Sequence, residues 1–337
     1  MDRTNRPIAV LAMRADLPER LFDMDARERL KQVALVDLSG CLTEFNSEAA
    51  RRCLADAEVL LTGWDCPPIT SHVLDLAPHL RAVVHAAGTV KGHLDVACWE
   101  RGLAVSTAAD ANAVPVAEFT LAMMLLAGKR AHQATRFYEK RRAAPPGNDL
   151  LEVGNYRRSV GIVGASRIGR RVIALLQPFD LEVLVSDPNL DPAEAAALGS
   201  HLVELDDLVR ESDIVSLHAP DLPSTYQMID ARRMSLMRNG ATLLNTARGV
   251  LVDTGALVDE LVTGRIHAIL DVTDPEPLPR DSPLYTLPNV VLTPHLAGAA
   301  GNELYRLGSW AVDELARWAT GVPFRSPVRL SGLATMA

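Results

Sequence analysis

Cysteine is scarce in this sequence. The 337 residues include four cysteines, with no CxxC pair and no spacing to histidine of the kind that metal sites use. The four are Cys41, Cys53, Cys66 and Cys98. Few and unpaired cysteines are typical of proteins in a reducing compartment. The sequence therefore predicts free thiols, a cytoplasmic location and no metal site.

A basic excess and a long uninterrupted apolar run are also missing. The net charge is -8 and the Lys and Arg residues are dispersed, which argues against an extended nucleic-acid or anionic-membrane surface. The apolar run at 8–13 is too short for a signal peptide, and the run at 113–128 is interrupted by Glu118. We therefore expect no membrane span and no nucleic-acid partner.

The length is sufficient for about two domains. Short strand-like runs occur at 8–13, 33–38, 58–62, 81–86 and 103–106, and helical patterns separate most of them. After a predicted helix at 114–129 and an arm or loop at 129–158, strands alternate with helices again up to a last helix at 302–319. Such alternation is typical of parallel sheets with helices on their faces, so we predict an α/β protein with two doubly wound parallel-sheet domains.

One segment has the pattern of a dinucleotide-binding turn. Residues 160–163 are apolar, a glycine turn follows, and apolar residues then recur at helical spacing until Pro178. The next predicted strand ends at Asp187, where a carboxylate can accept hydrogen bonds from a ribose. Ser166 occupies the middle glycine position, so a Cβ and a hydroxyl must be accommodated beside a pyrophosphate. No arginine follows Asp187 to bind a 2′-phosphate, so the pattern favours NAD over NADP; a plain tight turn is the alternative.

Polar residues follow several predicted strands, at the sheet edge where open parallel sheets bind ligands. The segments are His218-Ala-Pro220, Thr246-Ala-Arg248-Gly249, Asp271 with Glu276 beyond it, and Pro294-His295-Leu-Ala-Gly298. Each residue alone could be structural, but a histidine, a carboxylate and an arginine together suit hydride transfer on a 2-hydroxy acid. The histidine would exchange the hydroxyl proton, the carboxylate would orient the imidazole, and the guanidinium would bind the substrate carboxylate and carbonyl.

Four motifs occur in a defined order along the chain. They are Gly161-Ile-Val-Gly-Ala-Ser-Arg-Ile-Gly169 with Asp187, Asn245-Thr-Ala-Arg-Gly249, Asp271-Val-Thr-Asp-Pro-Glu276-Pro-Leu278, and Leu287-Pro-Asn-Val-Val-Leu-Thr-Pro-His295-Leu-Ala-Gly298. Through these motifs, and through an interdomain helix start at Asn112-Ala-Val-Pro-Val-Ala-Glu118, the chain resembles the D-isomer-specific 2-hydroxyacid dehydrogenase family over nearly its whole length. Formate dehydrogenases of the same superfamily are similar but carry Gln at the position of Glu276.

The resemblance implies a role for each site residue. His295 would be the general acid/base, Glu276 its partner and Arg248 the substrate-binding residue. The residues implied to bind NAD are Gly164, Ser166, Arg167, Ile168, Gly169, Asp187, His218, Pro220, Thr225, Thr246, Ala247 and Asp271. The substrate carboxylate would be bound by a loop that contains Ala87, Gly88, Thr89, Val90 and Lys91.

The resemblance also implies the domain organisation. A discontinuous, flavodoxin-like substrate domain would consist of residues 1–108 and 297–337, and a Rossmann NAD-binding domain of residues 109–296 would be inserted into it. Family members are commonly homodimers. The implied partner is a small anionic 2-hydroxy or 2-keto acid.

One departure bears on the substrate. The loop reads Gly88-Thr-Val-Lys91-Gly92-His93, and its Lys-Gly pair is similar to the substrate loop of phosphite dehydrogenase. Lys91 would then bind a strongly anionic substrate; the alternative is a solvated lysine, and His85 beside it is expected to be structural. Two other functions remain open from the sequence, phosphite oxidation and NAD(H)-responsive binding of the kind found in corepressors that resemble this family.

Overall fold

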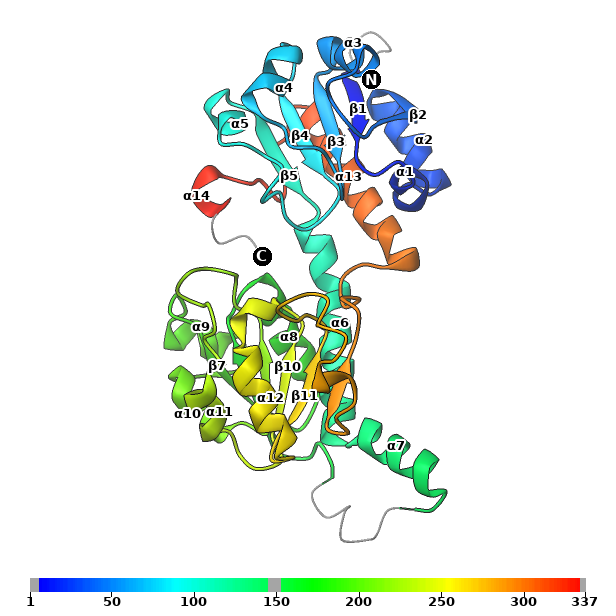
Figure 1. Cartoon of the computed structure of the whole chain (residues 1–337). Coiled ribbons are helices and arrows are strands. Elements are labelled where there is room, and N and C mark those ends of the chain that lie inside the picture. The colour runs from blue at the N-terminus through cyan, green and yellow to red at the C-terminus, as the bar shows by residue number, and fades with distance from the viewer. Residues whose placement is uncertain (1–5, 145–152, 334–337) are drawn as a thin grey trace. The chain divides into compact units, whose positions relative to one another are not determined.

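The computed structural model describes residues 6–144 and 153–333. The chain divides into two compact units (Figure 1). Unit 1 consists of Met1–Ala113 and Ala299–Met336, and unit 2 is Val114–Gly298. The sequence-based boundaries were 1–108 with 297–337 and 109–296, so both divisions insert one continuous unit into a discontinuous one.

Unit 1 contains a five-stranded parallel sheet of order β2-β1-β3-β4-β5. Its strands are β1 (Ile8–Ala12), β2 (Leu35–Leu42), β3 (Val59–Thr62), β4 (Ala82–His85) and β5 (Ala104–Thr107). Its helices are α1 (Leu17–Leu21), α2 (Met24–Val33), α3 (Glu48–Asp56), α4 (Ser71–Leu76), α5 (Ala97–Glu100), α13 (Leu304–Ala319) and α14 (Leu330–Leu333).

Both faces of the unit 1 sheet are buried, which is why its central strands are apolar throughout. On one face, Leu61 and Val84 pack with α1, α2 and the apolar side of α13. On the other face, Leu60 and Val83 pack with residues of α3, α4 and α5. Helix α13 therefore completes the core of a unit whose sheet ends at Thr107, 197 residues before the helix begins at Leu304.

Unit 2 contains a seven-stranded parallel sheet of order β12-β11-β10-β9-β6-β7-β8. Its strands are β6 (Arg158–Val163), β7 (Leu181–Ser186), β8 (His201–Leu202), β9 (Ile214–Leu217), β10 (Thr242–Asn245), β11 (His267–Leu270) and β12 (Val290–Leu292). Its helices are α7 (Ala131–Arg141), α8 (Arg167–Leu176), α9 (Pro192–Ala197), α10 (Leu205–Glu211), α11 (Ala231–Leu236) and α12 (Thr254–Val262).

The strand order reverses between β6 and β9, which places the first βα turn of unit 2 at the switch point where doubly wound sheets bind ligands. Helices α10, α11 and α12 cover one face of this sheet. Helix α8 covers the other face together with α6 (Ala109–Gly128), which begins in unit 1 and continues into unit 2. The prediction of an α/β fold with two doubly wound parallel sheets is confirmed.

Helix α6 is long and apolar enough to cross a membrane by length and composition alone, with a mean hydropathy of 1.4. Half of that stretch is buried, and Ala117, Met124 and Ala127 pack in the core of unit 2. The same composition is found in core helices, and its packing makes α6 a core helix.

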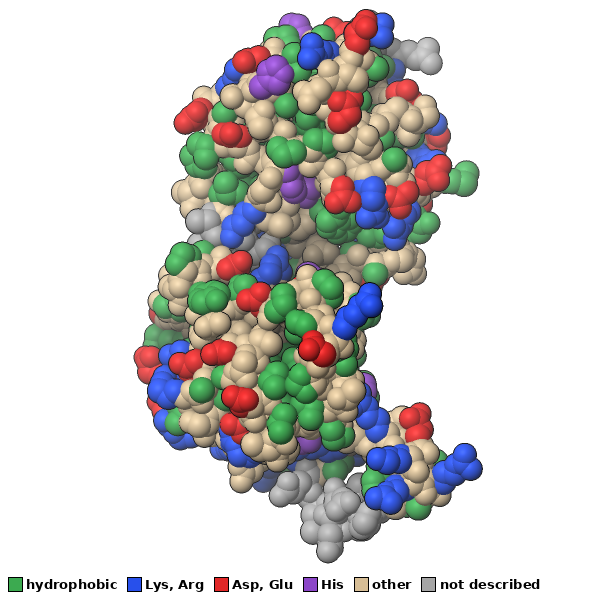
Figure 2. All heavy atoms as spheres, viewed as in Figure 1, with side chains coloured by type: hydrophobic (Ala, Val, Ile, Leu, Met, Phe, Trp, Pro, Cys, Tyr) green, Lys and Arg blue, Asp and Glu red, His purple; other side chains and the backbone are tan. Residues whose placement is uncertain are grey.

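Two sequence-based assignments were wrong. Residues 131–141 were predicted as part of an arm or loop, but they form helix α7. None of its residues is buried and its sequence is mostly polar, so its few apolar residues give a weak helical signal; Lys and Arg side chains are prominent along it (Figure 2). Part of the predicted arm, residues 145–152, lies outside the described residues. The strand predicted at 33–38 starts at Leu35 because Val33 ends α2, and it continues to Leu42 as an edge strand of mixed polarity.

Candidate active and cofactor site

The glycine turn joins β6 to α8. Gly164 has φ of 97°, a conformation that L side chains rarely adopt, and a Cβ there would lie 2.9 Å from the Ala219 nitrogen. A Cβ on Gly169 would lie 2.1 Å from the carbonyl oxygen of Gly164. Glycine is therefore required at both positions, because neighbouring backbone comes too close for a Cβ. At Gly164 this backbone belongs to the residues after β9, and at Gly169 it belongs to the glycine turn itself.

Ser166 is the N-cap of α8. Its φ of -66° is ordinary for any residue, and its hydroxyl accepts a hydrogen bond from the Gly169 N–H at 3.4 Å. Ser166, which occupies the middle glycine position of the dinucleotide-binding pattern, therefore caps the helix, which a flexible glycine could not do with a side chain. The N–H groups of the first turn of α8 lie where an anion would gain from the helix dipole.

Asp187 follows the end of β7. One carboxylate oxygen accepts a hydrogen bond from the Ala165 N–H and the other from the Asn189 N–H, each at 2.8 Å. The carboxylate thus holds the glycine turn and its own loop in place. Each oxygen of an ionised carboxylate has a further lone pair, so Asp187 retains acceptors for ribose hydroxyls.

His218 is buried beneath the glycine turn, with 3% of its surface exposed. Its Nε2 lies 2.9 Å from the Ser216 hydroxyl, and its buried Nδ1 has no hydrogen-bond partner among the described residues. Burial lowers the pKa of His218 to about 3, so the imidazole is neutral at physiological pH. The adjoining loop is internally bonded, since the Thr225 hydroxyl donates to the carbonyl oxygen of Pro220 at 2.6 Å.

The loop after β10 carries Arg248. The side chain of Asn245 organises it, because its amide donates to the Arg248 carbonyl at 2.8 Å and its oxygen accepts from the Ala247 N–H at 3.0 Å. Buried Thr246 is held by a hydroxyl contact with Thr120 of α6 at 2.9 Å. No role was predicted for Asn245, although it lies within one of the sequence motifs. The feature that could have indicated its role is an amide side chain at the end of a buried strand.

Asp271 anchors the loop that carries His295. The Asp271 carboxylate is 2% exposed and accepts hydrogen bonds from the Leu296 N–H and the Ala297 N–H, each at 2.9 Å, and from the Thr293 hydroxyl at 2.5 Å. The backbone N–H of His295 donates to the Asp271 carbonyl at 2.9 Å. This anchoring role was not predicted from the sequence, which assigned Asp271 to the cofactor.

His295 and Glu276 are brought together. The imidazole Nδ1 lies 2.7 Å from a carboxylate oxygen of Glu276, and both side chains are partly exposed to solvent. His295 has φ of 52°, a left-handed conformation that is uncommon for a residue other than glycine and that clusters at functional sites. The carboxylate engages Nδ1, so Nε2 is the nitrogen that remains for proton exchange with a ligand.

Arg248 shares this edge of the sheet. Its pKa is lowered by burial, an effect that the negative charges of Asp221 and Glu276 oppose. The following residue, Gly249, packs so tightly on the next loop that a Cβ would lie 2.1 Å from the carbonyl oxygen of Thr273. This contact joins the Arg248 loop to the loop of Glu276. A guanidinium that is partly removed from water binds a carboxylate more strongly than an exposed one does.

The loop of residues 87–91, predicted from the sequence to bind the substrate carboxylate, follows β4 in unit 1. Gly88 lies near the side chain of Asn112, whose oxygen accepts a hydrogen bond from the Ala299 N–H at 3.0 Å. Within the described ranges, the N–H groups of Gly88, Thr89 and Val90 donate to no protein group. Successive free N–H groups in a loop are suited to an anion. Lys91 forms no ion pair with any described residue.

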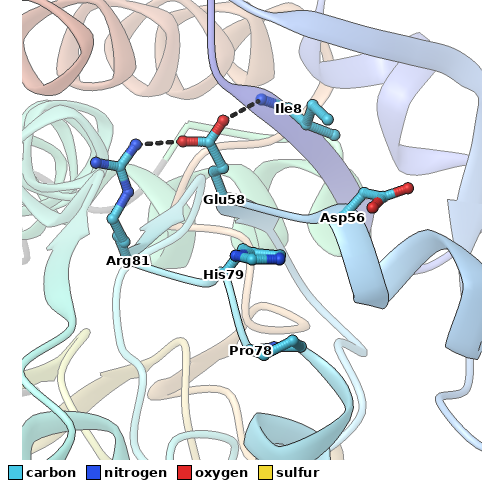
Figure 3. A pocket seen from close by; sticks show the side chains of 6 residues that line it. All are labelled: Ile8, Asp56, Glu58, Pro78, His79 and Arg81. Atoms are coloured by element: carbon cyan, nitrogen blue, oxygen red, sulfur yellow. Dashed lines mark hydrogen bonds and ion pairs between the residues drawn. The ribbon is translucent and has the colours of Figure 1, made fainter.

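A hollow lies at the opposite edge of the unit 1 sheet from the 87–91 loop, around the amino ends of β1 and β4 (Figure 3). Two of its charged groups pair with each other, because Glu58 bonds to Arg81, and Glu58 also accepts from the Ile8 N–H at 3.4 Å. No group of three or more potential metal ligands occurs within residues 6–144 and 153–333.

Comparison with known proteins places these features in a family. Residues 121–297 match the model of the D-isomer specific 2-hydroxyacid dehydrogenase, NAD binding domain. A relative named glyoxylate/hydroxypyruvate reductase B, from Yersinia pestis, is 34% identical over 307 residues, which cover 88% of this chain and 91% of the relative. The chain belongs to the D-isomer-specific 2-hydroxyacid dehydrogenase family. Its cofactor is accordingly NAD, as the sequence predicted.

Other relatives are longer. The D-3-phosphoglycerate dehydrogenase of Methanocaldococcus jannaschii is 33% identical over 293 residues, which cover 86% of this chain and 54% of the relative. The chain thus spans about half the length of the curated relatives of that name that it matches. Among solved structures, the TT0316 protein of Thermus thermophilus is 31% identical to this chain, with a TM-score of 0.75. The match covers 96% of this chain and 100% of the TT0316 chain.

Proposed function

We propose that this protein is an NAD-dependent dehydrogenase that interconverts a small D-2-hydroxy acid and its 2-oxo acid. The observation that carries the proposal is the 2.7 Å contact between His295 and Glu276, on the same sheet edge as half-buried Arg248 and the glycine turn. These groups are an acid/base, its orienting carboxylate, an anion-binding cation and a dinucleotide site. Together they supply what hydride transfer to a carbonyl requires.

The residues divide the reaction as follows. Arg248 binds the substrate carboxylate and polarises the C2 carbonyl with a forked guanidinium. When bound, NADH supplies the hydride that adds to C2. As the C–O π bond breaks, the oxygen takes the proton on His295 Nε2, and Glu276 stabilises the imidazolium before the transfer through Nδ1. In the oxidative direction, the same nitrogen accepts the hydroxyl proton.

The cofactor would be held by the residues of the turn and of the strand ends. Gly164 and the first turn of α8, including Arg167 and Ile168, offer N–H groups and positive charge to the pyrophosphate. Asp187 offers carboxylate oxygens to the ribose, and Asp271 lies where the nicotinamide carboxamide is expected. The glycines support this assignment, because a Cβ at Gly164 or Gly169 would collide with backbone and fill the turn.

The test is a steady-state assay of NADH oxidation with a panel of 2-oxo acids, from glyoxylate and hydroxypyruvate to branched and dicarboxylic acids. We expect turnover with at least one acid and a fall of roughly 100- to 10,000-fold in His295→Gln, the range for loss of a positioned acid/base. His72→Gln, on α4 of unit 1, is the matched control. Turnover retained in His295→Gln would remove this residue from the mechanism. NADH binding without turnover on any acid would favour a cofactor-sensing binding protein.

A second candidate substrate is phosphite. It is favoured by Lys91, whose ammonium forms no ion pair with a described residue and follows three free N–H groups of the loop. Phosphite-dependent reduction of NAD, lost in Lys91→Gln, would support it. Enzyme that binds NAD and reduces none with phosphite would exclude it.

We further propose that the protein is a cytoplasmic homodimer, with a substrate domain of residues 1–108 and 297–337 and an NAD-binding domain of residues 109–296. Helix α7 supports the assembly, since none of its 11 residues is buried and its contacts with unit 2 include only a few hydrogen bonds, such as those of Gln133 and Arg136, so its exposed side is available to a second chain. Light scattering that gives the mass of one chain would contradict the dimer.

A further inference from the structure

Two histidines flank the substrate loop on the carboxyl side of the unit 1 sheet. His85 is the last residue of β4, directly before the loop, and His93 follows it. Their ring centroids lie 4.7 Å apart. His85 is 1% exposed, and the Nε2 atoms of both rings are buried without a partner among the described residues. Buried polar atoms without partners are uncommon in folded proteins, so a pair of them at one loop calls for an explanation.

The His85 ring and the His93 backbone are both held by groups outside the loop. The Nδ1 of His85 lies 2.9 Å from the hydroxyl of Thr62, the last residue of the neighbouring strand β3, and this hydroxyl is fully buried. The backbone of His93 is held in turn, because its carbonyl accepts a hydrogen bond from the Ile69 N–H at 2.8 Å. The His85 ring, bonded to β3, therefore packs against the ring of a residue whose backbone is bonded to the segment before α4.

The loop itself has few ties of its own. The N–H of Lys91 donates to the Thr89 hydroxyl at 3.2 Å, and the N–H groups of His93 and Leu94 donate to the Val90 carbonyl. We therefore expect His85 and His93, at the two ends of the loop, to determine the orientation of the loop N–H groups that would bind an acid. Burial lowers the pKa of His85 to about 3, helped by His93 and opposed by the Thr89 backbone, so the ring is neutral and acts through geometry rather than charge.

We propose that His85 is a positioning residue that fixes the substrate loop through its Nδ1 contact with Thr62 and its packing on His93. This inference rests on the proposed function, in which the loop binds the acid group of the substrate. It goes beyond the expectation that His85 is merely structural, because it predicts a measurable effect of the ring on substrate affinity.

The experiment separates the two nitrogens of the ring. Asparagine places its amide near the position of Nδ1, and glutamine places its amide near Nε2. We expect His85→Asn to keep KM for the 2-oxo acid within about threefold of wild type, and His85→Gln and His85→Leu to raise KM by about tenfold, the factor for one hydrogen bond. The kcat value should change less than KM, and the NADH dissociation constant should be unchanged.

Thr62 provides the second, independent variant. Thr62→Val should raise KM as His85→Leu does, Thr62→Ser should restore it, and the double variant Thr62→Val with His85→Leu should be no worse than either single one. A merely structural role would instead lower the melting temperature and the active fraction, and leave KM unchanged.

Three results would overturn the inference. KM unchanged in both His85→Leu and Thr62→Val would show that the pair does not position the loop. His85→Gln equal to or better than His85→Asn would exclude the route through Nδ1. If the wild-type enzyme turns over no 2-oxo acid, the proposed function and this inference fail together. If the wild-type enzyme is active but KM is the same in the His85 and Thr62 variants, only this inference fails. Should His85→Leu fail to fold, the Thr62 variants decide.

Discussion

The Nδ1 atom of His295 lies 2.7 Å from Glu276, although the two residues belong to different loops and His295 holds a left-handed φ of 52°. A histidine in this conformation is maintained by its surroundings rather than by its own preference. The surroundings are the Asp271 carboxylate and the N–H groups after His295. His295, the proposed acid/base, and the residues that support it therefore form one hydrogen-bonded group that spans neighbouring loops.

The first prediction concerns Glu276. Glu276→Gln keeps the shape of the side chain and removes the charge that stabilises the imidazolium, so kcat should fall by roughly 10- to 100-fold, less than for loss of the histidine itself. Steady-state rates with the 2-oxo acid test this effect. Glu182→Gln, exposed on β7, is the control, and an unchanged kcat in Glu276→Gln would contradict the pairing.

The second prediction concerns Asp271. Asp271→Asn replaces one of two acceptor oxygens by a donor, so it leaves a backbone N–H of the His295 loop without its acceptor. We expect a loss of about 1–3 kcal/mol in the free energy of unfolding and a lower kcat. Thr293→Val, which removes one donor, should have the smaller effect. Chemical denaturation and steady-state rates are the measurements, and equal stability of Asp271→Asn and wild type would show that the carboxylate does not hold the loop.

Ser166 gives the third prediction. Ser166→Ala removes the N-cap acceptor of α8 and should lower the free energy of unfolding by about 1 kcal/mol, whereas Ser166→Gly should cost only a few tenths. Ser166→Gly should also bind NADH more tightly, because the backbone then approaches the pyrophosphate without a Cβ. Titration of NADH fluorescence and thermal unfolding check the two parts. Weaker NADH binding in Ser166→Gly would mean that the hydroxyl contributes to the cofactor site.

The fourth prediction concerns pH and His218. The folded-state pKa of about 3 lies below the ordinary value of 6.5, so the unfolded chain binds more protons between these values. The contribution of this group to stability is therefore intact above about pH 6.5 and is lost as the pH falls towards 3. His218→Gln should lose less stability than wild type between pH 7.5 and 5, by up to about 2 kcal/mol. Denaturation midpoints at both pH values test it, and parallel losses would contradict the assignment.

Much of the fold could be predicted from the sequence, because buried parallel strands are apolar runs and their helices have one apolar side. The strand predicted at 58–62, for example, is β3 of Val59–Thr62. Helix α7 escaped prediction because its sequence is mostly polar and charged and none of its residues is buried, so its few apolar residues give only a weak helical signal. Edge strand β2 was misplaced because it is only partly buried.

The residue types of the candidate site followed from chemistry and from family resemblance, but their supports did not. Nothing in the sequence indicated that Asp271 accepts from residues 296 and 297, or that Asn245 ties the Arg248 loop. Such contacts depend on how two loops meet in space, and the same side chains could equally bind solvent or ligand. The contact between His85 and Thr62 is of this kind as well, since it joins the ends of neighbouring strands.

Helix α13 has a consequence for the order in which the chain is made. Synthesis reaches all of Val114–Gly298 before it reaches Leu304–Ala319, so unit 2 has its full sequence while unit 1 still lacks the helix that packs on Leu61 and Val84. The sheet of unit 1 is thus synthesised first, but its core is the last to be completed. Until then the face that carries Leu61 and Val84 is covered only by α1 and α2, so part of its apolar surface stays exposed to aggregation while unit 2 is being made.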